Sequence, residues 1–268
     1  MGLRRHGLLL LLAALPAARP ANAQRLGAEL ADAGHDALRI LASPAHIQTD
    51  DLPTLGAVIG GAVVVGALDA PIQRWIDRHE GSLLVRAATP FREGSPLSRL
   101  GLAGTLWPVS GALYLAGLIA DDRALRDAGL GCGATLAAST TIRHAIYRLV
   151  SRPRPGTGER PYAISVPGGD WEHHSFFAGH TSNIVGCTAF WDRRFRLGAA
   201  ALPLYALAAG VSVSRTIDGA HWASDTYVGV AFGYAAGRLV ADRMRGRVEP
   251  RTTEPDPALV LVVRWPAR

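Results

Sequence analysis

The sequence contains no lysine, so arginine accounts for all 28 residues of these two basic types. Ala, Gly and Pro are abundant as well, and high-GC coding alone produces such a composition. Guanidinium groups also bind phosphate through paired hydrogen bonds, so an arginine-rich chain suits anionic partners. The net charge of +6 does not decide between these explanations, and only the positions of the arginines indicate function. No arginine run is interleaved with aromatic residues in a recognisable module, which argues against nucleic-acid binding.

Strand-like alternation of polar and apolar residues is absent until the segment ALVLVVRW near the C-terminus. Apolar segments rich in Gly and Ala follow one another instead, separated by turns or charges, at residues 52–70, 101–120, 128–150, 181–191, 197–213 and 222–241. This pattern predicts an all-α bundle of six main helices. We expect a further helical segment at residues 24–51 and a proline-rich tail at 248–268, with room for one short edge strand.

Long uninterrupted apolar runs are also few. A membrane span needs about 20 apolar residues, which residues 101–120 provide, whereas 52–68 and 197–214 are borderline. Hydrophobic residues make up 49% and charged residues 19% of the chain, apolar for a soluble protein but modest for a polytopic membrane protein. We expect membrane association, with a tight soluble bundle as the alternative.

The N-terminus has the features of an export signal. Arg4 and Arg5 precede the apolar run GLLLLLAALPAA, and the small-residue triplet Ala21–Ala23 follows. This order predicts a signal peptide at residues 1–23, cleaved after Ala23, with an uncleaved anchor as the alternative. Export permits disulfides. The two cysteines, Cys132 and Cys187, lie in separate apolar segments, however, so we expect buried free thiols, with a bridge as the alternative.

The distribution of basic residues suggests an orientation. The stretches WDRRFR and DRMRGR lie opposite the loop SRTIDGAH if the helices alternate in direction. The positive-inside rule then places that loop outside the cytoplasm, facing the periplasm or the exterior. Six full spans after a translocated N-terminus would place it inside. Either one early helix therefore does not span an inner membrane, or the domain is exported whole as a soluble periplasmic protein.

Two residues of the stretch SRTIDGAHWASD, residues 214–225, form the first candidate pair. His221 and Asp225 are four apart and share a face if a helix starts near Trp222. Asp225 is then expected to accept a hydrogen bond from one ring nitrogen of His221. That bond would fix the tautomer and leave the other nitrogen free as a nucleophile. A pair that only stabilises a helix start is the alternative.

A candidate anion site lies in SFFAGHTS, residues 175–182. Gly179 and His180 stand where an apolar helix begins, and free N–H groups at a helix start attract anions. Gly179 lets the backbone approach closely. His173 and His174, just upstream, are interpreted as loop residues, with a metal site as the alternative.

Arginines supply the remaining candidates, in YRLVSRPRP (residues 147–155) and beside His221. Arg154 and Arg215 can each hold phosphoryl oxygens with a planar fork. Arg152 is a possible further contact. Surface ion pairs are the alternative for these arginines.

Together the three stretches resemble the type 2 phosphatidic acid phosphatase (PAP2) family, which shares its fold with vanadium haloperoxidases. The family pattern is Lys, six residues, Arg-Pro; then Pro-Ser-Gly-His; then Ser-Arg, five residues, His, three residues, Asp. The third motif is complete here as Ser214, Arg215, His221 and Asp225. The resemblance covers roughly residues 52–245 and implies a PAP2-type domain, which we place at 52–247. It further implies His221 as nucleophile, His180 as the acid for the leaving oxygen, and no metal or cofactor.

The first two motifs depart from the family pattern. Tyr147 stands where the family has Lys, and Phe177 and Ala178 replace Pro-Ser. Tyr147 can donate one hydrogen bond to phosphate but brings no charge. Arg143, one turn earlier on the same helix face, is expected to replace the missing cation, with Arg148 as the alternative. The lost serine hydroxyl would remove a hydrogen bond worth about 1.5–3 kcal/mol, which lowers activity without abolishing it.

The resemblance therefore implies a metal-independent phosphatase that hydrolyses monoesters or diphosphates through a phosphohistidine. Its substrates would be phosphorylated lipids or small soluble phosphate esters. A vanadate-dependent haloperoxidase is one alternative, against which the short chain and Tyr147 both count. A phosphate-lipid binding protein without turnover is the other, suggested by Tyr147 and Ala178.

Overall fold

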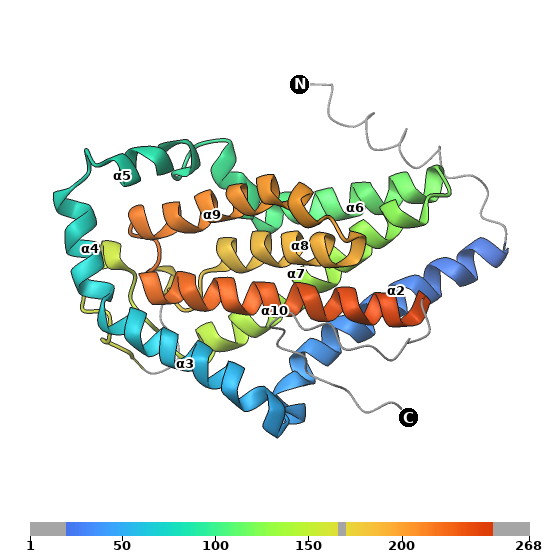
Figure 1. The fold of residues 1–268 in the computed structure, drawn as a ribbon, viewed down its shortest axis with the longest axis horizontal. Helices are drawn as coiled ribbons and strands as arrows, with labels where there is room; N and C mark the ends of the chain where they lie inside the picture. Colours follow the sequence, from blue (N-terminus) through green and yellow to red (C-terminus); the bar gives the residue numbers. More distant parts are fainter. Residues whose placement is uncertain (1–19, 166–169, 249–268) are drawn as a thin grey trace.

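The computed structural model describes residues 20–165 and 170–248, and their regular secondary structure is helical (Figure 1). Two isolated bridges, Ser151 with Ser165 and Arg152 with His174, are the extended pairings in this part of the chain. The α-helices are α2 (Pro20–Ala42), α3 (Leu52–Ala67), α4 (Asp69–Arg78), α5 (Leu83–Ala88), α6 (Ala103–Ile119), α7 (Arg123–Leu149), α8 (Gly179–Phe195), α9 (Leu202–Ile217) and α10 (Ala223–Val248). The all-α prediction is confirmed for these residues.

Each of the six predicted segments overlaps one of the helices α3, α6, α7, α8, α9 and α10, although the last four extend beyond the predicted bounds. Helix α2 covers much of the predicted segment 24–51. The sequence did not predict α4 and α5, because both are short and α4 is rich in charged residues. The predicted signal peptide and C-terminal strand lie almost wholly outside the described residues. The expected cleavage site after Ala23 falls within α2.

Helix α8 occupies the centre of the bundle, between α9 and α10 in Figure 1. Eleven of its residues, from Gly179 to Phe190, are buried. Small residues let α10 approach it closely: a Cβ at Gly237 would overlap the carbonyl oxygen of Gly186. Phe190 and Val240 belong to the main apolar core beside this contact. The central helix is therefore held rigidly along its length, and its first residues are fixed with it.

A disulfide joins α7 to α8, between Cys132 and Cys187, whose Cα atoms are 4.7 Å apart. The expectation of two free thiols is therefore wrong. Both residues are fully buried in an apolar cluster with Leu106 and Leu136. The two cysteines are 55 residues apart in the chain, and only the close packing of the two helices brings them together. A bridge of this kind is typical of proteins from oxidising compartments.

Two helical segments in the described ranges are long and apolar enough to cross a bilayer, Thr49–Ala67 and Gly198–Ile217. Helix α6, which the sequence suggested most clearly, has 17 residues and is shorter than a full span. Only 11% of the Thr49–Ala67 window is buried, so Ile59, Val63 and Val64 lie exposed. These uncovered apolar side chains are compatible with membrane association.

Candidate active site

The predicted site residues gather at one end of the bundle, around a cavity of about 240 Å³. The start of α8, the end of α7 and the turn between α9 and α10 meet there. The backbone N–H of Ala178 donates to the carbonyl oxygen of Asp225 at 3.1 Å, which ties the starts of α8 and α10 together. Of the eight predicted residues, all but Asp225 line the cavity: Arg143, Tyr147, Arg154, Gly179, His180, Arg215 and His221.

The floor of the cavity is the N-terminus of α8. Ala178 is its N-cap residue and provides no side-chain cap. The first N–H groups of a helix have no partner within the helix, and they carry the positive end of its dipole. Gly179 keeps this surface open to Arg143, because a Cβ there would overlap the Arg143 guanidinium. The start of α8 is thus a ready site for an anion.

Three arginines surround this helix start. Arg143 Nη1 and the Nε atoms of Arg154 and Arg215 are buried without a hydrogen-bond partner among the described residues. Burial lowers the pKa of both Arg143 and Arg154. Arg148 is exposed on the same helix as Arg143 and does not line the cavity, so Arg143 is the cation that the structure places at this site. A bound phosphate could accept hydrogen bonds from these three unpartnered nitrogen atoms.

Arg154 and Arg215 are held by different means. The Arg154 guanidinium lies over the Trp171 ring, 4.3 Å from its centroid. Arg215 donates from Nη2 to Asp218 at 3.0 Å and to the carbonyl oxygen of Phe91 at 3.2 Å. Its own carbonyl oxygen accepts the N–H groups of Ala220 and His221, each at 3.1 Å. This turn explains why Arg215 and His221, six residues apart, face one cavity.

His180 has a strongly perturbed environment. Burial, followed by the charges of Arg215, Arg143 and Arg154, lowers the pKa of His180 to about 4. All four side chains line the cavity. Because a bound dianion would offset the three positive charges, it would raise this pKa again. With this pKa His180 is neutral at neutral pH, and a bound phosphate would favour its protonated form.

His221 does not pair with Asp225 as the sequence suggested. Its Nδ1 lies 2.6 Å from the backbone carbonyl oxygen of Ser175, so Nδ1 carries the proton and donates it. The spacing of four residues places Asp225 in the first turn of α10, whereas His221 lies in the turn before that helix. Burial, with the charge of Arg154 next in importance, lowers the pKa of His221 well below its usual range. The neutral ring therefore keeps Nε2 as its free basic nitrogen.

Asp225 is fully buried behind His221. It accepts hydrogen bonds from the Ser175 hydroxyl at 2.5 Å and from the Trp222 backbone N–H at 3.0 Å. It also forms an ion pair with Arg152. Burial raises the pKa of Asp225 to about 6, against the lowering effect of Arg152. Asp225 thus acts on His221 indirectly, through Ser175, whose carbonyl oxygen accepts the His221 proton, and through Trp222, the next residue in the chain.

Arg152 does not line the cavity as a further phosphate contact, but forms buried ion pairs instead. It bridges Asp225 and Asp69, whose Oδ2 lies 2.6 Å from Arg152 Nη2. Sequence reasoning missed Asp69, Ser175 and Ser224, which complete this buried network. A lone aspartate at position 69, the first residue of α4, carries no signal in the sequence for a contact with residue 152.

The residues that depart from the family pattern take supporting places. The Tyr147 hydroxyl donates to the carbonyl oxygen of Phe177 at 3.3 Å, and its ring stacks on His174 at 4.8 Å between centroids. A hydrogen bond from Tyr147 to phosphate would require the first contact to break. Phe177 and Ala178 are buried. Tyr147 therefore forms a wall of the cavity and supports the backbone that leads into α8.

The upstream histidines do not form a metal site. His173 lies 2.7 Å from Asp170 through Nδ1 and 3.1 Å from Glu159 through Nε2, and it is partly exposed. Throughout residues 20–165 and 170–248, no group of three or more His, Cys, Asp or Glu side chains is arranged to hold a metal ion.

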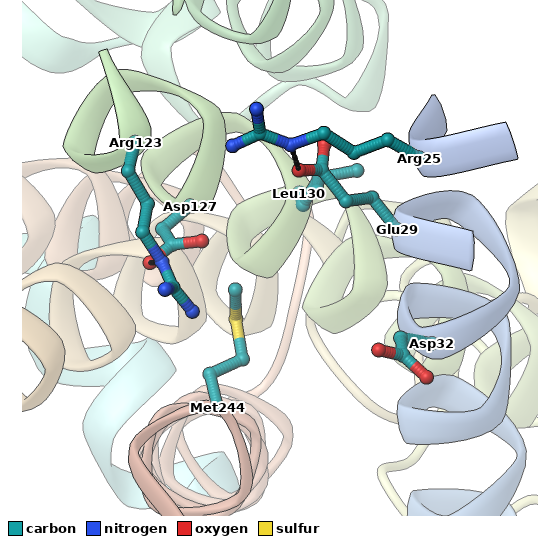
Figure 2. A pocket seen from close by; sticks show the side chains of 7 residues that line it. All are labelled: Arg25, Glu29, Asp32, Arg123, Asp127, Leu130 and Met244. Atoms are coloured by element: carbon teal, nitrogen blue, oxygen red, sulfur yellow. Dashed lines mark hydrogen bonds and ion pairs between the residues drawn. The ribbon is translucent and has the colours of Figure 1, made fainter. Parts of the chain in front are cut away.

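A second cavity, of about 500 Å³, lies at the opposite end of the bundle, beside the start of α7 and the end of α10 (Figure 2). Its lining contains both acidic and basic side chains. Arg25 pairs with Glu29 at 3.2 Å, and Asp127 pairs with Arg123 at 3.7 Å and with Arg194 at 2.6 Å. Because these charges neutralise one another, this cavity lacks the concentrated positive charge of the first.

Comparison with known families agrees with this geometry. Residues 128–248 match the family model described as PAP2 superfamily. This part of the chain belongs to the PAP2 superfamily. The match runs from α7 to α10 and includes all eight predicted site residues, but it begins later than the resemblance over residues 52–245 suggested. PAP2 proteins are generally phosphoric ester hydrolases, which supports phosphatase-type activity. Searches of curated proteins and of solved structures found no match.

Proposed function

We propose that this PAP2 protein is a metal-independent phosphatase that works through a phosphohistidine on His221. One observation carries the proposal most directly. The Nδ1–H of His221 is engaged by Ser175, so Nε2 is the free nitrogen of a ring that lines a cavity with three arginines. A neutral, oriented imidazole beside an anion site is what nucleophilic attack on a phosphate ester requires.

In the first step, Nε2 of His221 attacks phosphorus, and the bond from phosphorus to the ester oxygen breaks. Arg143, Arg154, Arg215 and the α8 N–H groups hold the remaining oxygens as charge spreads over them. His180, protonated in the substrate complex, gives its proton to the departing oxygen, and the alcohol leaves. The neutral His180 then accepts a proton from water as that water attacks phosphorus. The N–P bond breaks, phosphate departs, and both histidines return to their starting states.

Phosphorylated lipids are the proposed substrate class, with diphosphates and small phosphate esters as further candidates. The uncovered apolar side chains of Thr49–Ala67 and the second apolar segment, Gly198–Ile217, support a position at a membrane. The disulfide supports export, with the site facing the periplasm or the exterior. A protein placed in this way meets lipid headgroups at the bilayer surface.

Phosphate release from a panel of lipid phosphates, lipid diphosphates and soluble esters, measured with a chelator present, tests the proposal. Vanadate can adopt the five-coordinate geometry of the transferring phosphoryl group, so we expect it to inhibit. Activity that disappears on chelation and returns with zinc or magnesium would contradict the mechanism. Phosphate binding without release from any substrate would favour the binding protein, and halide oxidation with added vanadate would favour the haloperoxidase.

A further inference from the structure

We propose that Asp69, which lies outside the matched residues 128–248, is a positioning residue for the nucleophile. It is the first residue of α4, and its side chain is fully buried. It lies 83 residues before Arg152 and 155 before Ser224 in the chain, yet it contacts both. This inference rests on the proposed function, because it assigns Asp69 a role in the same reaction.

The contacts of Asp69 use both carboxylate oxygens. Oδ1 accepts the backbone N–H of Ser224 at 2.9 Å. Oδ2 accepts the Ser224 hydroxyl and Arg152 Nη2, each at 2.6 Å. Ser224 is the second residue of α10, whose first N–H groups have no partner within the helix. Asp69 thus fixes the start of α10 and one side of the Arg152 guanidinium at the same time.

The remaining contacts lead from Arg152 to His221. Arg152 Nη1 donates to Asp225, whose other oxygen accepts the Ser175 hydroxyl. The carbonyl oxygen of Ser175 accepts the proton of His221 Nδ1. Arg152 Nε is occupied by the carbonyl oxygen of Pro161 at 2.8 Å. Because the guanidinium is planar and buried, removing the partner on one side changes how it meets Asp225 on the other.

Phosphate binding does not depend on this network directly. The backbone N–H of Arg154 donates to the carbonyl oxygen of Glu172 at 2.9 Å, and Arg143 and Arg215 belong to α7 and α9. A loss of Asp69 should therefore disturb the ring of His221 more than the arginines around the cavity. That difference separates a positioning role from a general contribution to stability.

The test compares Asp69→Asn with Asp77→Asn in the full-length protein. Asp77 is an exposed carboxylate on the same helix and contacts only Gln73 among the described residues. For Asp69→Asn we expect kcat to fall about 10-fold, the lower end of the range for losing an outer-shell partner of a metal-bound histidine, because Asp69 acts on His221 through intervening residues. The inhibition constant of inorganic phosphate should stay within about twofold of wild type, as at a site whose arginines are undisturbed. Asp77→Asn should match wild type in both.

A second readout does not need turnover. In protein labelled with ¹⁵N-histidine, the His221 ring of wild type should be protonated at Nδ1 alone, and Asp69→Asn should show a mixture of tautomers. The His221 signal is assigned by its loss in His221→Gln. If wild type releases no phosphate, the proposed function fails, while the tautomer comparison still decides the role of Asp69.

Ser224→Ala covers the case in which Asp69→Asn does not fold. This substitution removes the hydroxyl between Asp69 and Arg152 but keeps the charges of Asp69, Arg152 and Asp225. We therefore expect kcat to fall less than in Asp69→Asn, with the inhibition constant of phosphate unchanged. Unchanged kcat and tautomer in the variants that fold would overturn the proposal. So would a fall in thermal stability with kcat unchanged, or a loss of kcat matched by an equal loss of phosphate binding.

Discussion

Ser175 holds His221 through its backbone: its carbonyl oxygen lies 2.6 Å from Nδ1 of the ring. Its hydroxyl donates to Asp225 at 2.5 Å. The tautomer of the proposed nucleophile is thus set by a main-chain group, which no side-chain substitution at position 175 removes. The carboxylate of Asp225 acts one step further away, on the residue that holds the ring.

This arrangement predicts graded losses on substitution. Ser175→Ala keeps the carbonyl oxygen and removes one hydrogen bond to a carboxylate, worth about 1.5–3 kcal/mol. Asp225→Asn also breaks a buried ion pair, which destabilises a protein by about 3–5 kcal/mol. We expect both variants to retain measurable turnover and Asp225→Asn to unfold at lower denaturant. Kinetics and denaturant titrations check this, and a Ser175→Ala enzyme as inactive as His221→Ala would contradict it.

The low pKa of His180 predicts an acidic pH profile. The profile of kcat/KM reports the free enzyme, in which the pKa of His180 is about 4. With an alkyl phosphate, whose leaving group needs a proton, kcat/KM should fall as pH rises above this value. The fall of kcat should begin at higher pH than the fall of kcat/KM, because a bound phosphate group raises the pKa of His180. With a nitrophenyl phosphate, whose leaving group needs little protonation, kcat/KM should fall much less as pH rises. An equal fall of kcat/KM for the two substrates would contradict the assignment of His180 as the proton donor.

The disulfide predicts a redox-dependent stability. Closing a loop of 55 residues stabilises a protein by about 4 kcal/mol in the chain-entropy model. We expect wild type that is unfolded, reduced and refolded under reductant to melt at a lower temperature than the oxidised protein. A Cys132→Ala/Cys187→Ala variant should melt at one temperature with and without reductant. Equal melting of oxidised and reduced wild type would contradict the predicted stabilisation by the bridge.

The orientation of the site is tested with reporter fusions in whole cells. An alkaline phosphatase reporter joined after residue 221 should be active, since this enzyme folds only outside the cytoplasm. The same reporter joined after Arg196, in the turn that follows α8, should be silent if α9 spans the membrane. An inactive reporter after residue 221 together with an active one after Arg196 would reverse the proposed topology.

The sequence was sufficient for the parts of the site that depend on local spacing. The apolar segments predicted α3 and α6–α10, and the motifs supplied six of the seven predicted residues that line one cavity. Arg143 was predicted from one helical turn of separation, and it lies in the cavity while Arg148 does not. Such relations follow from helix geometry alone.

The sequence was insufficient wherever contacts join distant segments. The spacing of His221 and Asp225 suggested a direct hydrogen bond, but the loop that brings Ser175 to the ring takes that place. Asp69 meets Arg152 and Ser224 only because α4 packs beside the start of α10. The bridge between Cys132 and Cys187 likewise depends on how closely α7 and α8 approach. None of these distances is encoded in residue spacing.

Trapping of the phosphoenzyme tests the central claim most directly, that His221 is the nucleophile and His180 the proton donor. His180→Ala should still accept phosphoryl from a nitrophenyl phosphate, whose leaving group needs little protonation. The phosphohistidine should then accumulate, because no base remains to activate water. We expect acid-labile, base-stable ³²P label on the His180→Ala protein and none on His221→Ala. Label on His221→Ala would contradict the account and move the nucleophile to another residue, with His180 the first to examine.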